Sequence, residues 1–159
     1  MSELTHLDAS GAARMVDVAS KDVTVRTATA SGRVLVSPDV VALLRAGGVP
    51  KGDALAVARI AGIMGAKKVP DLVPLCHPIA LHGVEISLRV DDDAVAISAT
   101  CRTADRTGVE MEALTAVAVA GLALVDMVKG VDPSAVISDV RVESKTGGKS
   151  ADWQRPGPS

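Results

Sequence analysis

Hydrophobic and polar residues alternate in two neighbouring stretches in the second half of the chain. Apolar side chains occupy every second position from Val84 to Val90, and small or apolar side chains do so again from Val95 to Cys101. A period of two is that of a strand with one buried face. The three aspartates Asp91–Asp93 lie between the stretches and suit a turn, so the pattern predicts a β-hairpin.

Helix signals precede this hairpin. Ser37–Pro38 predicts the start of a short helix over residues 40–45, and the two glycines that follow predict its end. Asp53 is expected to cap a second helix that runs to about Lys67 and is stopped by Pro70.

A long helix and two further strand patterns complete the order of elements. The helix is expected from about Val109 to Lys129, with Gly130 ending it. Thr24–Val36 predicts one strand or two, and Val136–Glu143 predicts the last strand. The order strand, helices, strand, strand, helix, strand is that of an α+β, ferredoxin-like split βαβ fold, an antiparallel sheet with helices packed on one face.

The long helix is apolar on nearly every side from Ala113 to Val125. Such a helix needs cover from more than one direction, and a small domain is expected to offer only its sheet. We therefore expect a second copy of the chain to supply the rest. The run is shorter than the roughly 20 residues that span a bilayer, and Glu112 and Asp126 bracket it, so we expect no membrane segment.

Composition narrows the class of protein. The 159 residues suit one domain over 1–159, with a loosely ordered arm at 1–14 and a tail at 153–159. A net charge of -2, one Trp and no Tyr or Phe argue against nucleic-acid binding, which favours a basic face and stacking rings. Two cysteines and no signal peptide predict a cytoplasmic protein without a disulfide framework.

Three prolines, Pro70, Pro74 and Pro78, predict a stiff, extended path around His77. His77 is either a structural histidine or a functional one. A Cys/His metal site is disfavoured, because no second Cys or His lies at a suitable spacing and Cys76 is expected to point away from its neighbour.

The segment RTGVEMEAL opens the long helix. Thr107 or Gly108 is expected to cap it, and Glu110 and Glu112 fall in its first turns. Acidic residues there complement the helix dipole, while the free N–H groups form a site for an anion or polar ligand. At about 100° per residue the two glutamates lie on opposite faces, so at most one is expected to face a given pocket.

Asp126 and Lys129 are three residues apart near the end of the long helix, so they can pair. A carboxylate there faces the last unpaired carbonyl groups, and such a local conflict marks a functional candidate. Lys129 suits this end and is otherwise an ordinary surface lysine. Glu112 lies roughly 21 Å away along the axis, so either the ligand is long or a second copy supplies one end of the site.

The segment KTGGKS at 145–150 resembles the end of a phosphate-binding loop, but Glu143 stands in place of the first glycine and no helix follows. It is either a flexible basic loop that closes over phosphates or a solvated turn. Scattered cations could offset a polyanionic ligand on this acidic chain. They are Lys21, Arg26 and Lys51, together with Lys129 and the loop lysines.

Several of these segments resemble the cyclic pyranopterin monophosphate synthase (MoaC) family. The blocks that carry the resemblance are MVDV, TATASGR, KGDALAVARIAGIMGAKK, LVPLCHP, RTGVEMEALTAVAVA, DMVKG and KTGGKS. It runs from about Leu4 to Trp153, with minor departures at Val125, Gly65 and Gly121. It implies a lyase that converts (8S)-3',8-cyclo-7,8-dihydroguanosine 5'-triphosphate to cyclic pyranopterin monophosphate and diphosphate in molybdenum cofactor biosynthesis. It also implies a ferredoxin-like homo-hexamer, a trimer of dimers with active sites between subunits.

The resemblance also implies roles for individual residues. Asp126 matches the catalytic acid/base, with Lys129 beside it. Substrate-binding roles are implied for Leu75, Cys76, His77, Glu110, Met111, Glu112, Lys51, Lys145, Lys149, Lys21 and Arg26. Of these, Lys21 and Arg26 belong either to the same subunit or to a neighbouring one. No metal or organic cofactor is expected, and Mg²⁺ accompanying the phosphates stays open.

Two other classes remain open from the residues alone. A non-enzymatic, ferredoxin-like metabolite-binding module explains the fold and the oligomer, but it gives no reason for Asp126 at a helix end. A structural assembly protein explains neither the basic loop nor the segment around His77.

Overall fold

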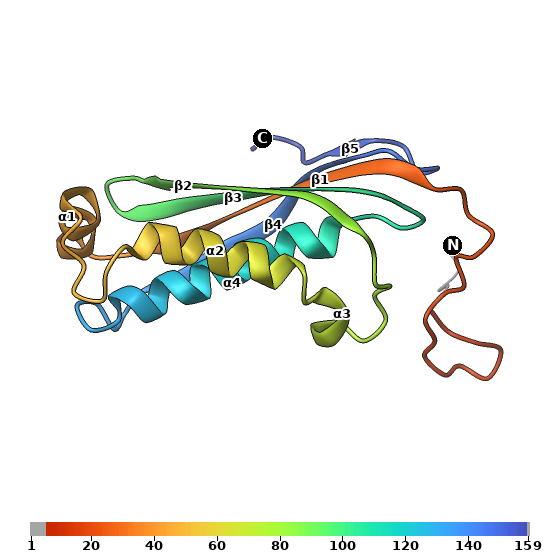
Figure 1. The fold of residues 1–159 in the computed structure, drawn as a ribbon, viewed down its shortest axis with the longest axis horizontal. Coiled ribbons are helices and arrows are strands. Elements are labelled where there is room, and N and C mark those ends of the chain that lie inside the picture. The colour runs from red at the N-terminus through yellow and green to blue at the C-terminus, as the bar shows by residue number, and fades with distance from the viewer. Residues whose placement is uncertain (1–5, 159) are drawn as a thin grey trace.

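A five-stranded antiparallel sheet with helices packed against it forms the body of the chain in a computed structural model, which describes residues 6–158 (Figure 1). The elements are β1 (Thr24–Leu35), α1 (Pro38–Ala46), α2 (Ala54–Ala66), α3 (Val69–Leu72), β2 (Leu81–Val90), β3 (Ala94–Asp105), α4 (Glu110–Val128), β4 (Val136–Thr146) and β5 (Trp153–Gln154).

The strand order β2-β3-β1-β4-β5 confirms the predicted fold. Every neighbouring pair is antiparallel, and β1 pairs with β3 along its whole length, from Thr24 opposite Asp105 to Leu35 opposite Ala94. The helices after β1 lead to β2 and leave room for β3 between the two strands. In the same way α4 leads from β3 to β4 on either side of β1, so two βαβ units interlock.

Helix α4 lies against the centre of the sheet, and α2 lies beside it over β2 (Figure 1). Two glycines of α2 allow the close approach of these helices. A Cβ atom at Gly62 would lie 2.8 Å from the carbonyl oxygen of Ala116, and one at Gly65 would lie 2.8 Å from the side chain of Val119. The sheet and α2 thus form two walls around the buried side of α4.

The expectation that only the sheet covers α4 is wrong, because α2 of the same chain supplies a second cover. Burial of α4 therefore does not by itself require a second copy. Apolar side chains nevertheless stay exposed on both helices, namely Val57, Ile60, Met64 and Leu122. With 19 residues α4 is long and apolar enough to cross a membrane by length and composition, but half of it is buried inside the fold, as in a core helix.

The helix ends follow the sequence in α1 and α2. The side chain of Ser37 accepts a hydrogen bond from the backbone N–H of Val40, and Asp53 does the same for Ala56. Gly47 ends α1 with a left-handed φ of 69°, which glycine adopts without strain.

Three local expectations are wrong. The residue before α4 is Val109, which makes no side-chain cap, so neither Thr107 nor Gly108 caps this helix. Pro70 lies in the first turn of the short helix α3, a position that tolerates proline, and a turn closed by the backbone hydrogen bond from Cys76 to Val73 follows, so the extended path begins only after that turn. The tail expected from 153 contains β5, which pairs with β4 at Lys145 opposite Trp153.

Candidate functional site

Asp126 lies in the last turn of α4 between two lysines. Its carboxylate accepts a hydrogen bond from Lys129 at 2.7 Å, which confirms the predicted pairing, and a second from Lys51 at 3.3 Å. The ammonium group of Lys51 also donates to the backbone oxygen of Asp126 at 2.9 Å. We call these three residues the lysine–aspartate cluster.

The two ammonium groups compensate the unfavourable position of this carboxylate at a helix C-terminus. The hydrogen bond from Lys129, followed by that from Lys51, lowers the pKa of Asp126 below its ordinary value. The group is therefore a carboxylate at neutral pH, with two ammonium groups hydrogen-bonded to it. Its side chain is 57% exposed, so a ligand can reach it.

A pocket of about 410 Å³ lies at the opposite end of α4, and we call it the helix-start pocket. It is lined by His6, Val16, Val18, Lys21, Leu75, Cys76, His77, Thr107, Gly108, Glu110, Met111 and Glu112. Seven of the substrate-binding candidates therefore meet in one place. Its volume is in the range of pockets that hold small molecules.

One expectation about this pocket is wrong. Glu110 and Glu112 both line it, because the pocket wraps around the first turn of the helix and takes side chains from both faces. Cys76 and His77 both line it as well, which leaves open whether their side chains point apart. Among residues 6–158 no three His, Cys, Asp or Glu side chains gather in a way that could hold a metal ion.

The segment before β1 contributes a contact that the sequence did not indicate. The Nε2 atom of His77 lies within hydrogen-bond distance of the backbone oxygen of Val16. A carbonyl oxygen only accepts, so Nε2 is the donor in this contact. Val16 and Val18 belong to the MVDV block of the family resemblance, but plain aliphatic residues before a strand give no chemical signal that would place them in a pocket.

Glu112 is the buried carboxyl group of this pocket, with 4% of the residue exposed. Burial is the main cause that raises its pKa to about 7, and the neighbouring Glu110 adds to the effect. Such a group exchanges protons near neutral pH and is suited to acid–base work.

The pKa of Glu112 predicts how stability depends on pH. The folded protein holds the Glu112 proton more tightly than the unfolded chain does, so its stabilising effect is complete below about pH 4.5 and is lost as the pH rises to about 7. Between pH 5 and pH 8, wild type should lose about 1–3 kcal/mol of unfolding free energy relative to Glu112→Gln. Urea unfolding at both pH values measures the difference. Glu110→Gln removes a carboxylate from the same turn and only the smaller cause of the raised pKa, so it should keep most of the wild-type slope; equal slopes for all three proteins would contradict the assignment.

A smaller hollow of about 160 Å³ adjoins the helix-start pocket and shares Lys21, Thr107, Gly108 and Glu110 with it. Three cations line this cation pocket, namely Lys21, Arg26 and Lys145. Lys145 contacts Glu110 at 3.5 Å. Lys21 and Arg26 therefore meet Lys145 within one chain, without help from a neighbour.

The turn after β4 completes the cation pocket. Gly147 has a φ of 88°, and a Cβ atom there would collide with the backbone oxygen of Val25. Arg26 reaches the same region and donates to the backbone oxygens of Asp105 and Arg106 at 3.2 and 3.3 Å. Lys145 belongs to β4 rather than to a loop, whereas Lys149 is exposed in the turn beyond.

The two halves of the candidate site lie at opposite ends of α4. Fourteen residues at 1.5 Å per residue place Glu112 roughly 21 Å from Asp126 along the axis. Lys51 belongs to the Asp126 end, away from the other cations expected to hold phosphates. Within one chain, the lysine–aspartate cluster is therefore far from the helix-start pocket.

Comparison with known proteins gives a consistent answer along most of the chain. The family model described as the MoaC family matches residues 15–148. A protein of Streptomyces coelicolor is 74% identical over 152 residues, which cover 96% of this chain and 89% of that protein, and it is named cyclic pyranopterin monophosphate synthase.

More distant relatives carry related names. A Nocardioides protein with the same name is 70% identical over 156 residues, covering 96% of each chain. A Mycobacterium tuberculosis protein, named cyclic pyranopterin monophosphate synthase 2, is 57% identical over 153 residues, covering 96% of this chain and 92% of its own. The chain therefore belongs to the MoaC family.

Proposed function

We propose that this chain is a lyase of molybdenum cofactor biosynthesis that converts (8S)-3',8-cyclo-7,8-dihydroguanosine 5'-triphosphate to cyclic pyranopterin monophosphate and diphosphate. One observation carries the proposal: Asp126 is held by Lys129 and Lys51 at 2.7 and 3.3 Å on an accessible surface. A binding module has no need of a carboxylate placed against helix carbonyl groups and then neutralised by two lysines. Rearrangement of the ring system, by contrast, requires repeated proton transfers.

The lysine–aspartate cluster supplies both partners of such transfers. Asp126 accepts a proton from the ring system as a carboxylate, and the ammonium group of Lys129 or Lys51 returns one to the leaving nitrogen or oxygen. Each proton lost by a lysine is replaced from Asp126, because the groups are hydrogen-bonded to each other. The cluster is thereby restored at the end of each cycle.

The helix-start pocket and the cation pocket are suited to holding the same substrate. The first offers backbone groups, aliphatic walls and the carboxyl group of Glu112 to a polar bicyclic ring. The second offers Lys21, Arg26 and Lys145 to the triphosphate. When the cyclic phosphate forms, diphosphate leaves, and fixed cations stabilise its developing charge.

These two halves act on one substrate only if a second copy of the chain brings its Asp126 end to this pocket. The roughly 21 Å between Glu112 and Asp126 within one chain exceeds what a single reaction centre spans. A two-fold symmetric dimer forms two complete sites, because each copy brings its Asp126 end to the pocket of the other copy. We assign the working form to such dimers, assembled as a trimer of dimers in the cytoplasm.

Mixing two inactive variants tests both the reaction and the shared site. Asp126→Asn lacks one half, and the double variant Glu112→Gln with Lys145→Ala lacks the other. After subunits are exchanged by mild denaturation and refolding of an equal mixture, half of the dimers are hybrids with one intact site of two. Diphosphate release from the cyclised GTP substrate should then recover to about a quarter of the wild-type rate.

The outcomes separate the two parts of this proposal. A wild-type chain that releases no diphosphate would refute the function itself. An active wild type with a mixture that stays inactive would leave the function intact and refute the shared site. Each variant refolded alone serves as the control for recovery without exchange.

A further inference from the structure

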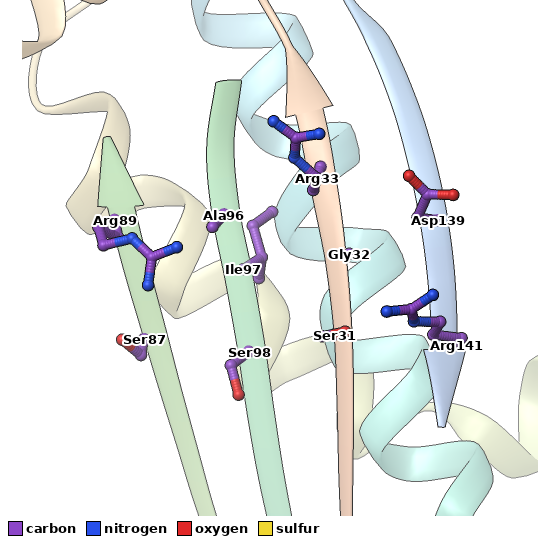
Figure 2. Close-up of a pocket in the computed structure, with 10 residues that line it drawn as sticks. All are labelled: Ser31, Gly32, Arg33, Ser87, Arg89, Ala96, Ile97, Ser98, Asp139 and Arg141. Atoms are coloured by element: carbon purple, nitrogen blue, oxygen red, sulfur yellow. The ribbon is translucent and has the colours of Figure 1, made fainter. Parts of the chain in front are cut away.

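The helix-free face of the sheet carries a hollow that the proposed reaction does not use (Figure 2). Its volume is about 500 Å³, and it is lined by Ser31, Gly32, Arg33, Ser87, Arg89, Ala96, Ile97, Ser98, Asp139 and Arg141. We call it the arginine hollow. It shares no lining residue with the helix-start pocket or the cation pocket.

The floor of the arginine hollow is a row of serines fixed by the strand register. Ser98 of β3 lies opposite Ser31 of β1 on one side and opposite Ser87 of β2 on the other. Neighbouring strands are about 4.8 Å apart, so the three hydroxyl groups form a line of roughly 10 Å. The hydroxyls of Ser87 and Ser98 can both donate and accept hydrogen bonds, which suits phosphate or sugar oxygens, whereas the hydroxyl of Ser31 donates to Glu143.

Three guanidinium groups from three different strands surround this floor. Arg141 lies opposite Ser31 at the end of the serine row, while Arg89 and Arg33 lie on either side of Ala96 in the next row. Figure 2 shows Arg89 pointing toward β3 and Arg141 pointing toward β1, so the two approach the hollow from opposite sides. The small side chain of Ala96 keeps the space between Arg33 and Arg89 open.

A bulge in β4 contributes to this arrangement. The pairing of β1 with β4 shifts between Ser31 and Arg33, and Asp139 has a φ of 56°, unusual for a residue other than glycine. Bulges re-aim side chains and are frequent beside binding sites. Here the bulge lies at the rim of the hollow, next to Arg141.

Among the residues that line the hollow, positive charges outnumber negative ones. Three cations and a single carboxylate, Asp139, line it. Each arginine also has an acidic partner outside the lining: Asp93 for Arg33, Asp91 for Arg89 and Glu143 for Arg141. The pair of Arg33 with Asp93 is solvent-exposed, and a phosphate can compete with the carboxylate in a pair of that kind. Glu143 is only 29% exposed and also accepts a hydrogen bond from Ser31, so its pair with Arg141 is held more firmly. Arg141 meets its partner through Nε, which leaves both terminal nitrogens free to donate.

We propose that the arginine hollow is a second anion site, which binds a small molecule carrying two or more phosphate groups. Two guanidinium groups facing each other from flanking strands match two phosphates better than one, since each guanidinium can contact a phosphate through two donors. The site is separate from the candidate active site, so its occupation does not depend on turnover.

Calorimetric titration of the full chain with inorganic diphosphate, and separately with GTP, tests this inference. Wild type should bind two molecules of at least one probe per chain. Arg89→Ala with Arg141→Ala should remove one of them or weaken it at least tenfold, and Lys21→Ala with Arg26→Ala should remove the other. Binding of both probes would indicate that the site recognises the phosphates. Binding of GTP alone would indicate that the serine row also contacts the ribose hydroxyls. Both outcomes support the site.

Two controls keep the result interpretable. Lys68→Ala removes an exposed cation that pairs with an aspartate elsewhere, and it should leave both binding events in place. Ser98→Leu fills the floor without changing charge and should abolish the same event as the double arginine variant. One molecule per chain in wild type, or unchanged binding in both hollow variants, would overturn the proposal. So would a fall in oligomer mass on sedimentation of the double arginine variant, because the face would then be a contact between copies.

Discussion

Replacing Asp126 with asparagine is expected to lower kcat for diphosphate release by about 10²–10⁴-fold, the usual contribution of a positioned acid or base. Asparagine keeps the shape of the side chain and can still contact Lys129 and Lys51, but it cannot take up a proton. The change lies at an exposed position, where ion pairs contribute little to stability, so the folded state should be almost as stable as that of wild type. A fall in kcat with an unchanged melting temperature therefore distinguishes chemistry from structure.

Asp71→Asn is the matched control for this variant. Asp71 also forms an exposed pair with a lysine three residues away, Lys68, at 3.9 Å. It lies in α3, away from the lysine–aspartate cluster, and its replacement should leave kcat within about twofold of wild type. If Asp126→Asn keeps more than a tenth of the wild-type kcat, the assignment of Asp126 as the proton-transfer group is wrong.

Among the Gly→Ala replacements in the helices, the one at Gly62 should destabilise the protein most. The new Cβ atom would lie 2.8 Å from the carbonyl oxygen of Ala116 and closer still to the side chain of Ile86. The side chain of Ile86 can shift, but the backbone of α4 cannot move without disturbing its contacts with the sheet. Overpacking of this kind costs about 1–3 kcal/mol, which urea unfolding measures directly.

Gly121→Ala in α4 is the natural counterpart, because the chemical change is identical. A Cβ atom at Gly121 would meet the side chain of Ile137 at 3.4–3.5 Å, an ordinary contact. The gain in helix propensity should then raise the unfolding free energy by up to about 1 kcal/mol. Equal stabilities of the two variants would show that the close approach of α2 and α4 does not restrict position 62.

The fold could be predicted from the sequence because its signals are local and agree with one another. The alternation from Val84 to Cys101 gave the β2–β3 hairpin, and the caps at Ser37 and Asp53 gave the starts of α1 and α2. The partner of α4 could not be found in this way. Whether α2 or a second copy covers that helix depends on how closely two backbones approach, and this is decided by Gly62 and Gly65 against side chains more than fifty residues away.

The candidate site was predictable in its members and less so in its arrangement. The pair of Asp126 and Lys129 follows from a spacing of three on a helix. Two other features depend on how loops and helix ends meet in space. Lys51 joins this pair, and Glu110 and Glu112 share a pocket. Periodicity describes the side of a helix, and it fails at the end, where a cavity can take side chains from every direction.

The scarcity of aromatic residues makes β5 a natural optical reporter. Trp153 is the only Trp in a chain without Tyr or Phe, so it dominates both the near-ultraviolet absorption and the intrinsic emission. Its ring is partly exposed, lies under the guanidinium group of Arg155 and belongs to a residue paired with Lys145, a wall of the cation pocket. The intrinsic fluorescence of this protein therefore comes from one residue beside the place where phosphates are proposed to bind. The rest of the molecule contributes almost no background.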